Sequence, residues 1–371
     1  MKKLFYFLSI VLILSTISCK KTDPEPGTDE PEEVDAALMS VEIPLIAVDG
    51  DIITVKGKIQ NFKSDPITSL EIKWQLDNGQ EHAHTFTGLN IGKLGVFEFT
   101  HPETFTATAG QHTLKVWISD VNGNGDDMFP SNNAQNKTFT VASASVQRKV
   151  LYEQFTSSTC GPCANFNTNY FNTGFLQSNT GKYTLIKYQM NWPGSGDPYY
   201  TAEGGTRRAY YGVNGVPTLF IDGEEGTHFS TSELQNDLDR HHAVPGVVNL
   251  QAYYTVTSSN EVKVKVIGTP YISGQFTLHI AVVEKTTTGN ASSNGETEFH
   301  NVMMKMVPDA NGTSINATDG TTFTERKEAS LNGTNIEEYS DLQVVVFIQD
   351  DTNKMVLQST IAVEDAGQID F

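Results

Sequence analysis

Short runs in which apolar and polar residues alternate fill the chain from about residue 39 to residue 141. This alternation is typical of strands that turn one face toward a core. Turn-forming clusters, such as the Asp-Asn-Gly at 77–79, separate the runs. The pattern predicts seven strands, over residues 41–48, 52–59, 70–76, 81–87, 96–100, 112–118 and 137–141. Seven strands at this spacing predict an immunoglobulin-like sandwich, although the disulfide of that fold is missing.

The last part of the chain repeats this pattern, and it predicts a second β-sandwich. The strand-like runs there cover residues 249–256, 262–267, 276–284, 299–307, 342–349 and 355–361.

The middle of the chain has a different pattern, in which strand-like and helix-like segments alternate. Ser230 followed by Glu233 forms a capping box, which predicts the start of the last helix of this region. The segments predict strands at 150–155, 183–190 and 216–223, and helices at about 160–176 and 207–211. Their order predicts an α/β layer. The expected fold class is therefore multidomain, with a central α/β domain at 146–244 between all-β sandwiches at 38–145 and 245–371.

The N-terminus has the features of a secretory signal. Lys2 and Lys3 precede an uncharged apolar stretch at 4–14 that is too short to span a bilayer, and a small residue precedes Cys19. The segment resembles the lipobox of bacterial lipoproteins, in which the chain is cleaved before an acylated cysteine. This resemblance implies a signal peptide at 1–18 and a membrane anchor, with palmitate among its acyl chains, on Cys19. A plain signal peptide or an uncleaved anchor is the alternative.

Residues 19–37 are acidic and proline-containing, so we expect a disordered tether. The lysine pair after Cys19 resembles the surface-export signals of some Gram-negative lipoproteins. We therefore expect a lipid anchor in the cell outer membrane, with the periplasmic and surface faces both left open. The formal net charge of the chain is −19, which repels phosphate backbones and excludes nucleic acid as an expected partner.

Only three cysteines occur in the chain, and two of them are close together in a Cys-Gly-Pro-Cys motif. Cys160 and Cys163 stand where the first helix of the middle region is expected to begin. Unpaired N–H groups and the helix dipole favour a thiolate there. Cys160 is the expected attacking thiolate and Cys163 the resolving thiol. A static disulfide between Cys160 and Cys163 is the alternative, and two cysteines alone do not complete a zinc site, so we expect neither metal nor cofactor.

The same motif carries a family resemblance. Cys160 to Cys163 at a strand-to-helix junction, with Tyr-Gly-Val-Asn-Gly-Val-Pro-Thr at 211–218, resembles the thioredoxin fold with its cis-proline loop. The resemblance implies a thioredoxin-like central domain in which Pro217 is cis and lies against the dithiol. It also implies that Val216, Pro217 and Thr218 bind the substrate chain.

Two positions depart from the redox members of that family. Gln154 stands where those proteins usually have a buried acid, and Thr159 stands where an aromatic residue usually precedes the first cysteine. Glu153 is adjacent, but strand alternation directs it to the opposite face. We therefore expect proton transfer from the resolving thiol to use water or another group.

A second, more diffuse resemblance covers residues 148–361. Four segments, at 150–156, 197–198, 210–213 and 299–302, are together similar to the 28-kDa-type outer-membrane lipoprotein family of Gram-negative bacteria. Most members of that family have no defined function, so the resemblance implies a location and an architecture.

These patterns lead to two functional hypotheses. The first is a lipid-anchored thiol-disulfide oxidoreductase-like protein whose partners are protein thiols or disulfides of the cell envelope. The alternative is a non-catalytic binding or adhesion lipoprotein with a structural disulfide. Whether the protein is an enzyme stays open at this point.

Overall fold

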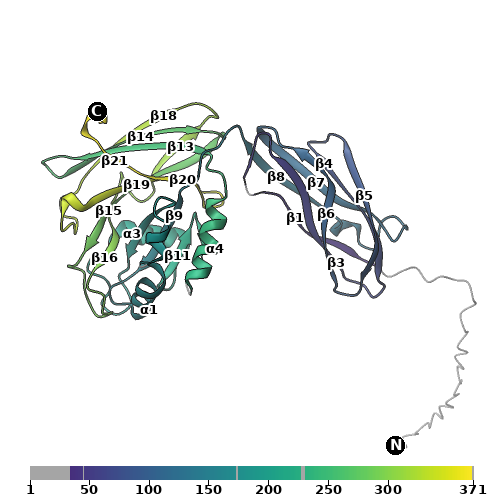
Figure 1. Cartoon of the computed structure of the whole chain (residues 1–371), viewed down its shortest axis with the longest axis horizontal. Helices are drawn as coiled ribbons and strands as arrows, with labels where there is room; N and C mark the ends of the chain where they lie inside the picture. The colour runs from purple at the N-terminus through teal and green to yellow at the C-terminus, as the bar shows by residue number, and fades with distance from the viewer. Residues whose placement is uncertain (1–33, 45, 173, 227–229, 370–371) are drawn as a thin grey trace, which may run out of the picture.

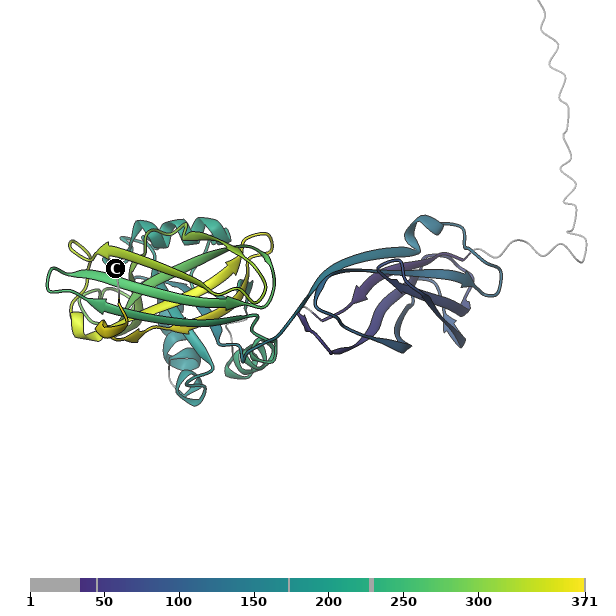
Figure 2. The same cartoon turned by 90° about the horizontal axis from the view of Figure 1, so that it is seen from above.

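The computed structural model describes residues 34–369, except 45, 173 and 227–229. The predicted signal peptide, Cys19 and most of the predicted tether lie outside the described residues. Figures 1 and 2 show two bodies joined by one segment of chain, with the N-terminal strands in one body and all helices longer than one turn in the other. No helix among the described residues is long and apolar enough to cross a membrane.

The N-terminal body consists of two antiparallel-rich sheets that share one core. The first sheet has the order β1, β3, β6, and the second has the order β2, β8, β7, β4, β5. Side chains from both sheets, including Ile59, Trp74, Phe99 and Val116, pack together between them. The strands are β1 (Ala36–Glu42), β2 (Ala47–Val48), β3 (Ile52–Asn61), β4 (Ile67–Leu76), β5 (Glu81–Ile91), β6 (Val96–Thr106), β7 (Gly110–Val121) and β8 (Ala134–Ala142).

The predicted strand at 41–48 is in fact two strands in different sheets. β1 ends at Glu42 and β2 begins at Ala47, with Pro44 between them. Proline has no N–H group to donate to a neighbouring strand, so a single continuous strand through this position is disfavoured.

The expectation of a central α/β thioredoxin-like domain is wrong. The structure is 50% strand and 14% helix, and the strands of the middle region belong to a larger sheet. β10 pairs in parallel with β16, with Lys187 opposite Val302, so the sheet continues into the C-terminal region. The reason is that β10 would otherwise be an open edge, and β16 satisfies its backbone groups. The boundaries predicted for the domains stay predictions.

This nine-stranded sheet runs in the order β12, β11, β9, β10, β16, β15, β19, β20, with β17 paired to β15. A four-stranded sheet, in the order β18, β14, β13, β21, packs on its C-terminal half. The strands of the large sheet are β9 (Val150–Thr156), β10 (Tyr183–Gln189), β11 (Thr218–Ile221), β12 (Glu224–Glu225), β15 (Gly274–Thr287), β16 (Phe299–Met306), β17 (Thr313–Ala317), β19 (Leu342–Asp350) and β20 (Met355–Ile361). Those of the smaller sheet are β13 (Val248–Val256), β14 (Glu261–Pro270), β18 (Phe323–Ser330) and β21 (Val363–Glu364).

Helices cover both faces of the β9 to β11 part of the sheet. One face packs against α1, α2 and α4 through Tyr152 and Leu185, and the other packs against α3 through Phe155 and Tyr211. The helices are α1 (Gly161–Phe166), the π-helix η2 (Asn167–Phe171), α2 (Phe175–Ser178), α3 (Ala202–Tyr211) and α4 (Thr231–His242), with one-turn 3-10 helices η1 (Pro130–Asn132), η3 (Tyr339–Asp341) and η4 (Ala366–Gln368). The predicted capping box is confirmed at the start of α4, where Glu233 N–H donates to Ser230 Oγ at 3.2 Å.

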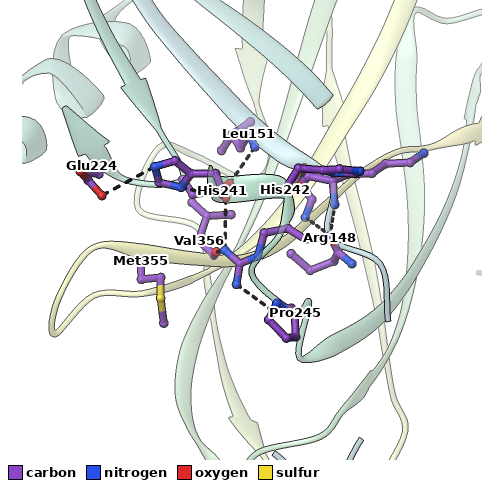
Figure 3. Close-up of polar contacts among 12 residues, drawn as sticks. Arg148, Leu151, Glu224, His241, His242, Pro245, Met355 and Val356 are labelled. Atoms are coloured by element: carbon purple, nitrogen blue, oxygen red, sulfur yellow. Dashed lines mark hydrogen bonds and ion pairs between the residues drawn. The ribbon is translucent and has the colours of Figure 1, made fainter. Parts of the chain in front are cut away.

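A buried arginine fastens the start of β9 to three other segments. Arg148 is 1% exposed, and its guanidinium donates to Asp222 Oδ2 at 3.2 Å, to the Val356 carbonyl at 2.7 Å and to the Pro245 carbonyl at 3.1 Å. Figure 3 shows the contacts with Val356 and Pro245, near His241 at the end of α4. These hydrogen bonds hold the start of β9 in place, and they thereby help to position the cysteine motif that follows the strand.

Candidate disulfide site

Cys160 and Cys163 form a disulfide at the junction between β9 and α1. Cys160 is the N-cap residue of α1, and its Sγ accepts the Cys163 N–H at 3.1 Å. The two residues are 1% and 0% exposed, whereas Gly161 and Pro162 between them are exposed. The backbone of the motif thus faces solvent while both sulfurs lie inside.

The proline loop lies against this disulfide. The Val216–Pro217 peptide bond is cis, and Cys160 Sγ lies 3.5 Å from the Val216 carbonyl oxygen. This contact is not a hydrogen bond, because a disulfide sulfur carries no proton. Thr218 begins β11, and its hydroxyl donates to the Gly215 carbonyl at 2.9 Å. The structure therefore places the two cysteines and Val216 together, with Thr218 bonded within its own loop.

A second loop, residues 288–298 between β15 and β16, covers the motif from another side. Asn294 N–H donates to the Ser158 carbonyl at 3.0 Å, and Asn294 Nδ2 donates to the carbonyls of Ser157 and Cys160 at 3.2 and 3.4 Å. Glu296 Oε1 accepts a hydrogen bond from Asn167 Nδ2 at 2.9 Å. The segment that connects two C-terminal strands is thus bonded directly to the cysteine motif.

The two neighbouring residues Glu153 and Gln154 on β9 face opposite sides of the sheet, as strand alternation predicts. On one side the Glu153 carboxylate, 1% exposed, accepts hydrogen bonds from Tyr188, Arg207 and Tyr211 at 2.6 to 3.0 Å. Burial alone would lower the pKa of Arg207, but the charge and hydrogen bonds of Glu153, together with Tyr211 and Tyr188, raise that pKa above its usual value. This side of β9 holds a buried charge pair with every carboxylate oxygen bonded.

On the other side, Gln154 lies in a polar group behind the cysteine helix. Gln154 Nε2 donates to Asn167 Oδ1 at 2.8 Å, while Gln154 Oε1 is buried with no hydrogen-bond partner among the described residues. Lys187 Nζ donates to Asn172 Oδ1 at 2.6 Å and lies 3.4 Å from Asn167 Oδ1. Burial lowers the pKa of Lys187 to about 7, and the more distant Glu296 charge opposes this shift.

Sequence reasoning identified Gln154 but not the groups around it. The signal for Lys187 was present, because it is the only lysine in β10, a strand with six of seven residues buried. No comparable signal marked Glu296, which is 129 positions from Asn167 along the chain. Within the described ranges, no group of three or more His, Cys, Asp or Glu side chains could hold a metal ion.

No protein-family model matches this chain, and no curated protein matches it. Solved structures similar to it include HBP35 of Porphyromonas gingivalis, with a TM-score of 0.48 and 17% identity over 62% of this chain and 80% of that chain. A domain of the outer membrane lipoprotein Omp28 from Porphyromonas gingivalis has a TM-score of 0.24 and 15% identity, over 32% of this chain and 89% of that one. The CARDB domain of the PF1109 protein from Pyrococcus furiosus has a TM-score of 0.26 and 12% identity, over 30% and 97%. Likenesses at this level assign neither an activity nor a ligand to this chain.

Proposed function

We propose that the Cys160–Cys163 pair exchanges disulfides with thiols and disulfides of other proteins in the cell envelope. The observation that carries the proposal is the hydrogen bond from Cys163 N–H to Cys160 Sγ, at the start of a helical run that continues through η2. A backbone donor aimed at a sulfur stabilises the thiolate more than the thiol, because hydrogen bonds to charged acceptors are stronger. After reduction, Cys160 is therefore the sulfur better prepared to carry negative charge.

The reaction balances without a cofactor. A partner thiolate attacks Cys160 Sγ, the bond between the two sulfurs breaks, and Cys163 leaves with the electron pair. A second thiolate of the partner then attacks the partner's sulfur in the mixed disulfide and releases Cys160 as a thiolate. The partner is oxidised to a disulfide and this chain is reduced to a dithiol. The reverse sequence oxidises the dithiol and reduces a partner disulfide.

The Val216 carbonyl supports the same assignment of roles. Its oxygen lies 3.5 Å from Cys160 Sγ, so a partner chain that reaches this sulfur would lie beside the Val216 to Thr218 segment. Thr218 is the first residue of β11, and it pairs with Phe155 of β9 on one side of that strand. We assign the Val216, Pro217 and Thr218 backbone to partner binding within this proposal.

The location is part of the proposal and is supported by the N-terminal sequence. The lipobox-like segment before Cys19 would leave an acylated cysteine that anchors the protein in the outer membrane. Labelling cells with a palmitate analogue tests this. The wild type should carry the label and a C19A variant should not, and a labelled C19A variant would contradict the anchor.

Trapping tests the chemistry. A C163S variant keeps Cys160 but cannot resolve a mixed disulfide, so it should accumulate covalent adducts with envelope proteins that disappear on reduction. A C160S variant, with only the fully buried Cys163, is the matched control and should accumulate few or none. The absence of adducts from C163S, with the variant present at wild-type levels, would contradict the proposal.

One observation favours the alternative, a binding lipoprotein with a static disulfide. Cys160 is 1% exposed, and Asn294 bonds to the carbonyl of the same residue, so the sulfur is closed to a partner thiol in this conformation. If a C160S/C163S variant retains every phenotype of the wild-type protein, that alternative is the better description.

A further inference from the structure

Lys187 is a buried cation with no carboxylate as a direct partner. It is 2% exposed, and its Nζ contacts only the amide oxygens of Asn167 and Asn172 and the ring of Phe171 in the described part of the chain. Burying an ammonium without a counter-charge is costly, and this cost lowers the pKa of Lys187 to about 7, so both its charged and its neutral form are populated near neutral pH. An apolar residue at this position would avoid the free-energy cost of burying an amine.

Lys187 lies close to the helical segment that carries the dithiol. Asn167 follows Cys163 by four residues in one helical run, and residues four apart in a helix share a face. Lys187 Nζ lies 3.4 Å from Asn167 Oδ1, on the strand that pairs with Gln154 directly opposite. The unpaired cation and the fully buried thiol of Cys163 thus lie on the same side of β9 and α1.

We propose that Lys187 holds the proton that Cys163 releases during exchange. Lys187 would thus do the work of the buried acid whose usual position is occupied here by Gln154. When Cys163 leaves the disulfide as a thiolate, the Lys187 ammonium gives it a proton and becomes a neutral amine. In the reverse direction the neutral amine takes the proton from the Cys163 thiol, and the thiolate attacks Cys160 and releases the partner. Lys187 thus acts as the acid and base for Cys163, and this role rests on the proposed exchange function.

Other groups near Lys187 are few. Glu296 in the loop at 288–298 is the nearest acid and reaches Lys187 through Asn167. On the adjacent strands, the titratable side chains that share the face of Lys187 by alternation and register are Tyr152 on β9 and His300 on β16. Burial raises the pKa of Tyr152, so it stays neutral, and His300 is paired with Glu298 at 3.2 Å. Lys187 is therefore the buried group on this face whose pKa lies near neutral pH.

The test measures the Cys163 thiolate directly, by its ultraviolet absorbance, in a C160S background where no exchange is needed. Adding K187M should raise the pKa of Cys163 by about 1 to 3 units, because the buried thiolate loses the ammonium that Lys187 forms on taking its proton. The matched control is K182M, which removes a partly exposed lysine just before the same strand. An unchanged Cys163 pKa in K187M would overturn the inference.

A second measurement uses the unmodified protein and does not depend on a variant that folds. The pKa of Lys187, followed through its side-chain nitrogen by NMR, should be higher in the dithiol form than in the disulfide form, because linkage between two sites is reciprocal. Equal values in the two forms would also overturn the inference. If both results agree with it while C163S traps no partner, the proton-holding role stands and the proposed exchange function fails.

Discussion

The two faces of β9 hold buried charges in opposite ways. On the face of Glu153, the carboxylate is paired with Arg207 and accepts hydrogen bonds from the hydroxyls of Tyr188 and Tyr211, and Gln349 Oε1 accepts a further bond from Arg207. On the face of Gln154, Lys187 is equally buried, but its hydrogen-bond partners among the described residues are neutral amides. Glu153 and Arg207 thus form a closed cluster, in which each charge has a charged partner. Lys187 and its amide partners form an open cluster, in which the lysine has no charged hydrogen-bond partner among the described residues. The difference indicates that the first cluster holds the sheet together and the second serves the disulfide.

The largest expected effect is on the closed cluster. E153Q leaves Arg207 charged and buried without its partner, so the free energy of unfolding should fall by about 3 to 5 kcal/mol. Urea denaturation measures this change. The control is E203Q, which breaks the partly exposed pair of Glu203 with Lys305 and should cost less than about 1 kcal/mol. Equal losses in the two variants would contradict the distinction between the clusters.

The open cluster should appear in the pH dependence of stability. The folded pKa of Lys187 is about 7 and its ordinary value is 10.5, so between these values the unfolded chain binds more protons and stability rises with pH. For the oxidised protein we expect a gain of about 2 kcal/mol between roughly pH 7 and 9, measured by denaturation. K187M should lose this gain and K182M should keep it. A flat profile in the wild type would show that Lys187 is not held neutral.

Much of this site could be expected from the sequence, but its surroundings could not. The capping box at Ser230, the strand-to-helix junction at Cys160 and the opposite faces of Glu153 and Gln154 all follow from local periodicity. The pairing of β10 with β16 does not, because runs of apolar residues look alike and no local feature selects a partner 115 positions away. The expectation of a separate central α/β domain was wrong for this reason. A sheet that ends at β10 and a sheet that continues into β16 have the same local sequence pattern.

A smaller effect concerns access to the disulfide. N294A removes the side-chain bonds to the Ser157 and Cys160 carbonyls, and each such bond contributes about 0.5 to 1.5 kcal/mol. If loop opening limits access to Cys160, reduction by a small thiol should become about threefold to tenfold faster, as followed in a stopped-flow assay. S292A, at an exposed position of the same loop, is the control. An unchanged rate in N294A would show that the loop does not restrict the sulfur.

The smallest expected effect is that of the distant acid on the open cluster. E296Q removes the one nearby charge that raises the pKa of Lys187, so that pKa should fall below its wild-type value by less than about 1 unit. Titration of the Lys187 side-chain nitrogen by NMR measures the shift. A rise would mean that the Asn167 contact, and not the Glu296 charge, controls the lysine.

The reduction potential of the Cys160–Cys163 pair tests the central claim most directly. The full-length protein would be equilibrated with glutathione buffers of known ratio, and the fraction of dithiol measured by alkylation. A pair that exchanges with envelope proteins should have a potential between about −270 and −120 mV. A potential below about −300 mV would mark a structural disulfide and contradict the proposed function.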